Sequence, residues 1–138
     1  MIKGGFRIIH SWEHPKLSNC GFSELFIYGE MPGGFIIGIA GARDPTPWGV
    51  GATRNIVGML VSDGYIIASG VGRGIDWIAV ITALKLGGRV VGVPPYYNYR
   101  TEYLIKHGGV VITPEIEPRE NVNRLLAYRD FIFACISD

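Results

Sequence analysis

Residues 64–76 read GYIIASGVGRGID, and this stretch decides the fold. Its apolar run, Tyr65 to Ala68, is typical of a short strand that is buried on both faces of a sheet. Alternating glycines follow, and residues 75–86 then carry apolar side chains at helical spacing. Glycine lets the backbone approach a ligand closely, and the first N–H groups of a helix have no intrahelical partner. The stretch therefore predicts a strand-to-helix turn that favours an anion such as phosphate.

A second turn of the same kind lies earlier in the chain, where residues 41–49 read GARDPTPWG between a predicted strand at 35–40 and a predicted helix at 47–62. The other predicted elements are strands at 24–28, 89–93 and 110–113, helices at 100–107 and 118–128, and a last apolar run at 131–136. This alternation predicts an α/β, Rossmann-like three-layer fold with a mostly parallel sheet and helices on both faces. Ligands of such sheets bind beyond the carboxyl ends of the strands, where the strand order reverses, so both turns are expected to face one crevice.

Length and composition set further expectations. A chain of 138 residues predicts one domain, 1–138, in which residues 1–34 form a lead-in segment with one strand. The net charge of +1 neither favours nor excludes a nucleic-acid partner, although nine of the 13 basic residues are arginine, the better phosphate ligand. No apolar run is long enough to span a membrane and no signal-peptide pattern is present, so a cytoplasmic protein is expected.

Neither metal chemistry nor catalysis is predicted. The two cysteines, Cys20 and Cys135, have no metal-ligand spacing and are expected to be buried reduced thiols. No Ser-His-Asp or Cys-His arrangement is recognisable in the sequence, so no catalytic residue, cofactor or metal is assigned.

The two turns supply the candidate phosphate ligands. Arg43 can form a bidentate contact with a phosphate, or pair with Asp44 on the surface. Gly70, Gly72 and Gly74 can offer backbone N–H groups to the same anion, or can simply form tight turns.

Three further residues of the second turn have two interpretations each. The hydroxyl of Ser69 can donate to the anion or bond the local backbone. Arg73 can contact a second phosphate or lie solvated in the loop. Asp76 can cap the following helix and favour its dipole, or contact a ribose or base.

Tyrosines follow the third predicted strand of the parallel set. An aromatic ring beside a basic cleft can stack a base, a contact worth about 1–3 kcal/mol. Tyr97 and Tyr99 are the candidates for this role, and Tyr103 is expected to pack against its neighbours.

These motifs resemble those of the DNA-processing protein A (DprA/Smf) family. The resemblance rests on the two turns and on residues 83–93, ALKLGGRVVGV, with looser likeness at 14–17 and 25–29. It implies single-stranded DNA binding, a recombinase partner during DNA uptake and a homo-oligomer. It also carries a DNA contact over to Arg129, which matches the first arginine of the family's R-N-R segment, whereas Asp130 and Phe131 do not match.

The chain also departs from the family pattern. Val80 stands where the family commonly has histidine, and residues 94–99 read PPYYNY in place of the family's G-x-D-x-x-Y-P. The sequence stops at Asp138 before a further family strand, so a minimal or truncated form of the family domain is expected.

Two functions stay open on the sequence. The first is single-stranded DNA binding in a phosphate-holding crevice. The second is a nucleotide-binding sensor or carrier of the related Rossmann-like families. Hydrolase activity is not expected, because residues 32–34, PGG, precede the first core strand and lack the glutamate of the phosphoribohydrolase motif.

Overall fold

The structure is a computed structural model that describes residues 5–18, 20–117 and 121–138. The described strands are β1 (Arg7–His10), β2 (Glu24–Tyr28), β3 (Ile36–Ile39), β4 (Ile66–Ser69), β5 (Val90–Gly92) and β6 (Val110–Thr113). The helices are the short 3-10 helix η2 (Ser11–Glu13) and the α-helices α1 (Pro47–Ser62), α2 (Ile75–Lys85), α3 (Tyr99–Lys106) and α4 (Val122–Ile136).

The strands form one mixed sheet in the order β1-β2-β6-β5-β4-β3. Strands β3 to β6 are parallel, and β1 and β2 extend the β6 side as antiparallel strands. The predicted α/β fold with a mostly parallel sheet is therefore confirmed. The expected reversal of strand order is not found among the described strands, because β3, β4, β5 and β6 neighbour each other in chain order.

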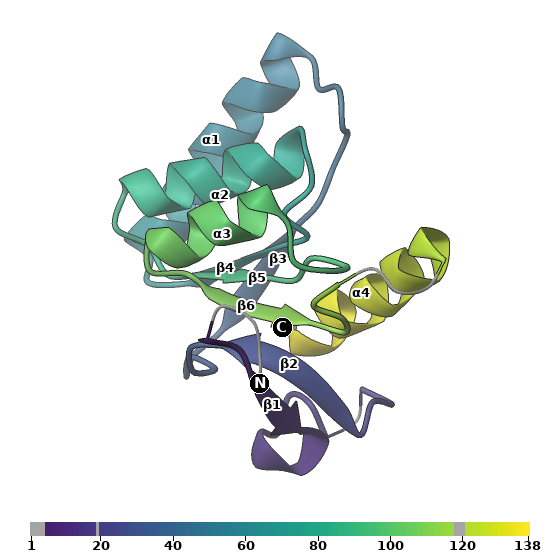
Figure 1. Ribbon diagram of the computed structural model, residues 1–138. Coiled ribbons are helices and arrows are strands. Elements are labelled where there is room, and N and C mark those ends of the chain that lie inside the picture. The colour runs from purple at the N-terminus through teal and green to yellow at the C-terminus, as the bar shows by residue number, and fades with distance from the viewer. Residues whose placement is uncertain (1–4, 19, 118–120) are drawn as a thin grey trace.

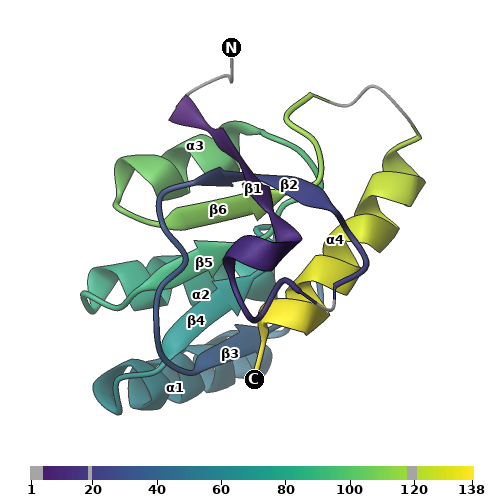
Figure 2. The ribbon, with the colours of Figure 1, turned by 90° about the horizontal axis from the view of Figure 1, so that it is seen from below.

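The helices form two layers around this sheet (Figure 1). The connections from β3 to β4, β4 to β5 and β5 to β6 all advance across the sheet in one direction. Because such crossovers are right-handed, their helices lie on one face, and α1, α2 and α3 lie together above the sheet. Helix α4 lies on the opposite face and runs obliquely beneath the strands (Figure 2). The chain thus changes face after β6, and this change brings α4 toward β3, the first parallel strand.

Each face of the sheet has its own apolar core, because successive strand residues point to opposite faces. Ile67 and Val111 join the core under α1–α3, together with Val57, Ala79, Val80, Ala83 and Leu104. Ile66 and Ile112 join the core on the other face, together with Leu25, Ile27, Ile132 and Ile136.

Local signals begin α1 where the sequence predicts. The hydroxyl of Thr46 accepts a hydrogen bond from the Gly49 N–H at 3.1 Å, and Pro47 occupies the first helical position. Ile56, which the helical pattern groups with core residues, is 52% exposed and lines a shallow cavity beside Gly38 and Ile39 of β3.

Helix α4 differs from its prediction. The sequence suggests a helix at 118–128 and a separate apolar run, whereas one helix covers Val122–Ile136, and positions 118–120 lie outside the described residues. Ile132 and Ile136, one helical turn apart, bury the same side of it. A side chain at Gly38 would lie 2.7 Å from the Phe133 ring, so α4 packs directly on the backbone of β3.

The end of the chain is tied to β3 and to the lead-in segment. Asp138 donates its N–H to the Ile36 carbonyl at 2.7 Å. Its carboxylate accepts from the Ile36 N–H at 2.7 Å and from the Lys16 ammonium at 2.6 Å. These charge-assisted bonds hold the pKa of the Asp138 carboxyl below its usual value.

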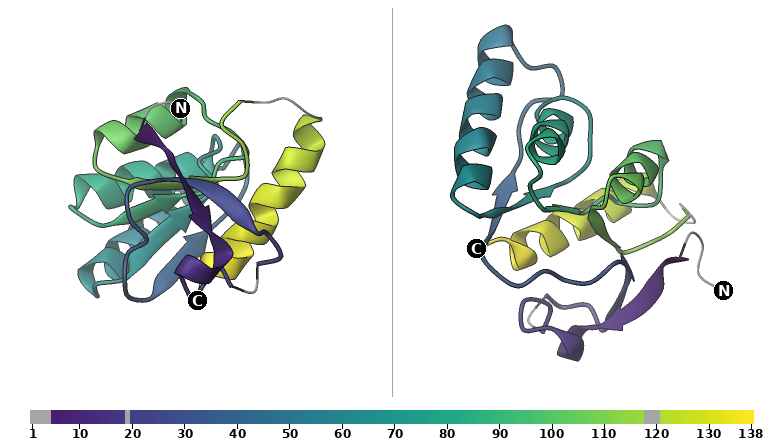
Figure 3. Two further views of the ribbon diagram at one scale, coloured as in Figure 1. Left: turned by 60° about the horizontal axis from the view of Figure 1, so that its bottom comes forward. Right: turned by 90° about the vertical axis from the view of Figure 1, so that its left-hand side faces the viewer.

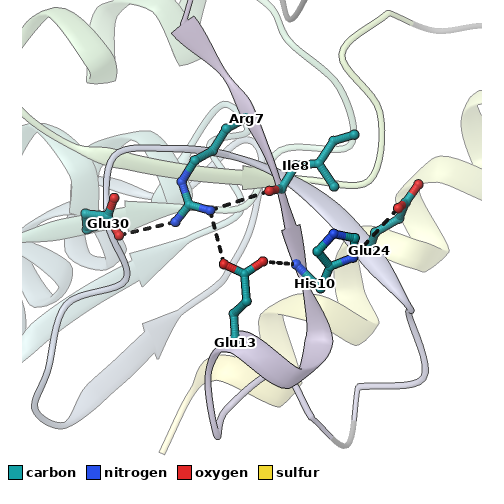
Figure 4. A network of polar contacts seen from close by, with 6 residues as sticks. All are labelled: Arg7, Ile8, His10, Glu13, Glu24 and Glu30. Carbon is teal, nitrogen blue, oxygen red and sulfur yellow. Dashed lines mark hydrogen bonds and ion pairs between the residues drawn. The ribbon is translucent and has the colours of Figure 1, made fainter.

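The lead-in segment contains a strand, β1, that the sequence analysis missed, beside the predicted strand β2. Strand β1 forms the edge of the sheet beside β2, and the segment also contacts α4, where the Phe22 and Tyr128 rings lie 5.6 Å apart (Figure 3). A polar network holds its outer side: Arg7 bridges Glu13 at 3.4 Å and Glu30 at 3.2 Å, and Glu13 accepts the His10 N–H at 2.6 Å (Figure 4). None of the helices formed by the described residues is long and apolar enough to cross a membrane.

Candidate phosphate-binding crevice

The two predicted turns lie on one crevice at the carboxyl ends of the parallel strands, because β3 and β4 are paired. Two adjoining cavities of about 200 and 380 Å³ form this crevice. Both are lined by Arg43, Gly70, Gly72, Arg73 and Arg129.

We call the smaller cavity the inner half and the larger one the outer half. The inner half is also lined by Ala40, Gly41, Asp76, Asp130 and Phe133. The outer half is also lined by Val71, Pro95, Tyr96, Asn98, Arg100, Val122 and Leu126. The crevice therefore runs from the turn after β3, along the loop after β4, to the segment after β5, with α4 as its other wall.

Arg43 is exposed in the β3–α1 turn, residues 40–46. Its guanidinium forms no hydrogen bond or ion pair with any residue of the described ranges. Asp44, the partner considered from the sequence, pairs with Arg73 instead, at 3.2 Å. Arg43 thus presents its N–H groups to both halves of the crevice.

Ser69 does not offer its hydroxyl to a ligand. The side chain is fully buried, and its oxygen donates to the Asp76 carbonyl at 2.9 Å and accepts from the Val71 N–H at 3.1 Å. Of the two interpretations of Ser69, bonding to the local backbone is the one observed. This bond supports a left-handed backbone at Val71, with φ of 62°, which non-glycine residues rarely adopt.

The three glycines of the β4–α2 loop, residues 70–74, serve close packing. A side chain at Gly70 would lie 2.6 Å from Nη1 of Arg129, and one at Gly72 would lie 3.2 Å from the Asp76 carboxylate. Gly74 has φ of 82°, and a side chain there would contact the backbone of the β3–α1 turn, 2.5 Å from the Arg43 carbonyl oxygen. Gly74 is not among the lining residues, and it joins the two turns rather than facing a ligand.

Asp76 occupies the floor of the inner half. It lies in the first turn of α2, where its charge favours the helix dipole as predicted, but it does not cap the helix, because Gly74 is the N-cap and no side-chain cap bond forms. Its carboxylate lies 3.2 Å from the position that a side chain at Gly72 would take, near the backbone N–H groups of Gly72 and Gly41. Burial raises the pKa of the Asp76 carboxyl, and these N–H groups together with the charges of Arg129 and Arg43 oppose that rise.

Arg129 connects α4 to the β4–α2 loop. Its Nη1 donates to the Gly70 carbonyl at 2.8 Å, and its Nε donates to Asp130 at 2.8 Å. The side chain is only 14% exposed, whereas Arg73 on the opposite wall is 59% exposed. Arg129 therefore builds one wall of the crevice while it still lines both cavities.

The predicted tyrosines occupy different environments. The Tyr97 ring packs edge-on against Phe6 at 5.9 Å. Tyr99 is 71% exposed and has the Arg100 guanidinium 4.8 Å above its ring, but neither Tyr97 nor Tyr99 lines the cavities. Tyr103 packs against Trp77 at 5.3 Å, as expected.

Tyr96, Asn98 and Arg100 also line the outer half, and none of them is among the site residues predicted from the sequence. Asn98 caps α3, because its side-chain oxygen accepts from the N–H groups of Arg100 at 3.0 Å and Thr101 at 3.2 Å. An asparagine followed by an amphipathic run signals the start of a helix. That signal places Arg100 in the first turn of α3, close to the carboxyl end of β5 and therefore near the crevice.

Neither the cysteines nor a metal cluster contributes to the crevice. Cys20 is buried beside Cys135, and burial together with that neighbour raises the pKa of the Cys20 thiol to about 12. Within the described ranges, no three His, Cys, Asp or Glu side chains gather closely enough to hold a metal ion.

Solved structures share this fold. The chain superposes on DNA processing protein A from Streptococcus pneumoniae with a TM-score of 0.75 and 20% identity, over 97% of this chain and 52% of that one. It superposes on DNA processing protein A from Helicobacter pylori with a TM-score of 0.74 and 20% identity, over 96% of this chain and 66% of that one. The Helicobacter pylori structure is described as a single-stranded DNA binding mode.

Curated relatives share part of the sequence. Protein Smf of Synechocystis is 42% identical over 65 residues, which are 47% of this chain and 16% of that protein. DNA processing protein DprA of Bacillus subtilis is 35% identical over 72 residues, which are 50% of this chain and 24% of that protein. The family described as DNA recombination-mediator protein A matches residues 18–138. Because this match covers most of the sequence, the chain belongs to the DNA recombination-mediator protein A family.

Proposed function

We propose that this chain binds single-stranded DNA along the crevice, with backbone phosphates held by arginine side chains. The observation that carries the proposal is the convergence of Arg43, Arg73, Arg100 and Arg129, from four separate segments, on the continuous outer half. Arginine is the preferred phosphate ligand because its planar guanidinium donates two parallel hydrogen bonds. Family membership and the described DNA binding of the Helicobacter pylori structure support the proposal.

The shape of the crevice favours a strand over a single nucleotide. Its two halves adjoin through five shared lining residues, so successive phosphates can contact Arg43 and Arg100 in turn. Tyr96 and Tyr99 are the proposed stacking residues, and Tyr97 is left out because its ring packs against Phe6. The role is binding, and no step in it requires a bond to be broken.

The contacts differ in kind from those expected of a glycine-rich phosphate loop. The Asp76 carboxylate lies close to the N–H groups of Gly72 and Gly41, so side chains rather than backbone are proposed to bind the strand. With about two to four phosphates neutralised, the logarithm of the binding constant should fall with the logarithm of salt concentration with a slope of about −1.4 to −2.8.

The test is fluorescence anisotropy of a labelled oligothymidylate at several salt concentrations. Arg43→Ala should weaken binding by about 1–3 kcal/mol, the cost of losing a charged hydrogen-bonding partner. Arg54→Ala is the matched control, because Arg54 is an exposed arginine of α1 that does not line the crevice. Equal affinities of the two folded variants would contradict the proposed site. Displacement of the oligonucleotide by AMP at equimolar concentration would favour the nucleotide-sensor function.

The family description adds a partner to this proposal. The family is described as a recombination mediator, and we propose that this chain first binds the strand and then passes it to a recombinase. The measurement is recombinase filament formation on oligothymidylate that this chain has already bound.

A further inference from the structure

The two halves of the crevice differ in charge although they share three arginines. The outer half adds Arg100 to Arg43, Arg73 and Arg129, and no acidic residue is among its described lining residues. The inner half has the same three arginines but also contains Asp76 and Asp130.

Asp76 stands where an anion would otherwise bind. Its Oδ2 lies 2.9 Å from the position that a side chain at Gly70 would take and 3.2 Å from the corresponding position at Gly72. The backbone N–H groups of Gly72 and Gly41 lie near its carboxylate and favour its charged form. A phosphate in the inner half must therefore lie beside a carboxylate that is part of the wall.

The charged groups around Asp76 come from every wall of the inner half. Helix α4 contributes Arg129 and Asp130, and the β3–α1 turn contributes Arg43. The β4–α2 loop contributes Arg73, which is partly neutralised by its ion pair with Asp44. Asp130 is likewise paired with Arg129. Little positive charge is left over, which suits a ligand with one negative charge better than a ligand with two.

We propose that Asp76 determines specificity by making the inner half select a phosphodiester over a phosphate monoester. A diester, as found inside a DNA strand, carries one negative charge. A monoester, as found on a free nucleotide, carries about 1.5–2 at neutral pH and is repelled more strongly by the carboxylate. The inference rests on the proposed function and adds to it a reason why strand interiors would be preferred to free nucleotides.

The experiment compares two ligands that differ only in this charge, thymidine 5′-monophosphate and its methyl ester. Binding to the full chain is measured directly from the thermal shift as each ligand is titrated at neutral pH. The wild-type protein should bind the methyl ester more tightly, even though an arginine-rich site would ordinarily favour the dianion.

Asp76→Asn keeps an oxygen that can accept a backbone N–H and removes the charge. It should improve binding of the monophosphate relative to the methyl ester by about five- to tenfold, as expected when one charge–charge repulsion at a partly exposed site is removed. Asp63→Asn is the matched control, because Asp63 is exposed at the end of α1 and does not line the crevice. The ratio of its affinities for the monophosphate and the methyl ester should equal that of the wild-type protein.

The outcomes separate this inference from the proposed function. A wild-type protein that binds the monophosphate as tightly as the methyl ester, or more tightly, overturns the role of Asp76 even if oligothymidylate binds. A folded Asp76→Asn variant with the same ratio of affinities for the two ligands as the wild type overturns the role of Asp76 as well. A clear preference for the methyl ester without oligothymidylate binding would support the selectivity and contradict strand binding. Because the wild-type ratio is itself decisive, the test holds even if the variant does not fold.

Discussion

The β3–α1 turn and the β4–α2 loop have the same design in sequence and different environments in the fold. Both follow a parallel strand and begin a helix, and both contain glycine and arginine, although β4 is fully buried and β3 is a half-buried edge strand. The β4–α2 loop is held from inside by Ser69, Asp76 and Arg129. The β3–α1 turn is exposed, and its Arg43 lacks a hydrogen-bonded or ion-paired partner within the described ranges.

The difference shows that a glycine-rich strand-to-helix turn is not by itself a phosphate site. Helix α4 places Arg129 against the β4–α2 loop, where it donates to the Gly70 carbonyl, and Ser69 bonds the loop backbone from inside. The β3–α1 turn is left facing the crevice. On the proposed function the β4–α2 loop is a scaffold and the β3–α1 turn a contact surface, and substitutions should separate their effects on stability and on binding.

The largest effect is expected at Gly74, where the two regions meet. Gly74→Ala should lower the free energy of unfolding by about 2–5 kcal/mol, because it combines backbone strain with overpacking against the β3–α1 turn. Gly64→Ala is the control, since Gly64 has φ of 86° but no atom within 4 Å of the added carbon. It should cost only the strain, about 1–2 kcal/mol. Urea unfolding measures both, and equal losses would contradict the role assigned to Gly74.

A smaller loss of stability is expected at Ser69. Ser69→Ala leaves the Val71 N–H without its acceptor, which should cost about 1–3 kcal/mol. Ser18→Ala, at an exposed serine that bonds the Pro15 carbonyl, should change stability by less than about 0.5 kcal/mol. If Ser69 contacted a phosphate instead, its substitution would weaken oligonucleotide binding and leave urea unfolding unchanged.

A graded effect of pH is expected at Asp76. Burial raises the pKa of this carboxyl in the folded protein above its ordinary value of 3.8, so the folded state binds the proton more tightly than the unfolded chain. The resulting stability is present below pH 3.8 and is lost as pH rises through the folded value. Wild-type stability should therefore fall relative to Asp76→Asn as pH rises above about 4, whereas Asp63→Asn should follow the wild type. If the free energies of unfolding of the wild type and of Asp76→Asn changed in parallel with pH, the raised pKa of Asp76 would be contradicted.

The smallest effect on stability is expected at Arg43, the residue that most distinguishes the exposed turn. Arg43→Ala should change the free energy of unfolding by less than about 0.5 kcal/mol, because the side chain forms no bond with a described residue. The same variant should lose oligonucleotide affinity. A marked loss of stability in urea would mean that Arg43 belongs to the scaffold and would remove the contrast between the two regions.

Local signals made much of this fold predictable. Thr46 and Pro47 begin α1 as the sequence indicates, and the apolar runs at β3, β4, β5 and β6 lie where they were expected. Continuously apolar strands that alternate with helices imply a parallel sheet, and in such a sheet paired strands bring their carboxyl-end turns together. Arg43, Gly70, Gly72, Arg73 and Arg129 are accordingly both sequence candidates and lining residues of the crevice.

The remaining features depend on contacts between segments distant in sequence. Strand β1 is short and becomes a strand only by pairing with β2, and α4 is one helix because Ile132 and Ile136 pack on the sheet. The Tyr97 ring packs edge-on against Phe6, a residue far from it in the sequence.

The sequence by itself determined the α/β class, the family and the two turns, because strand burial, helix starts and glycine turns are local properties. Only the tertiary structure decided which turn offers free donors. The packing of α4 and the position of the Asp76 carboxylate determine which N–H groups are already bonded, and that depends on residues brought together from across the chain.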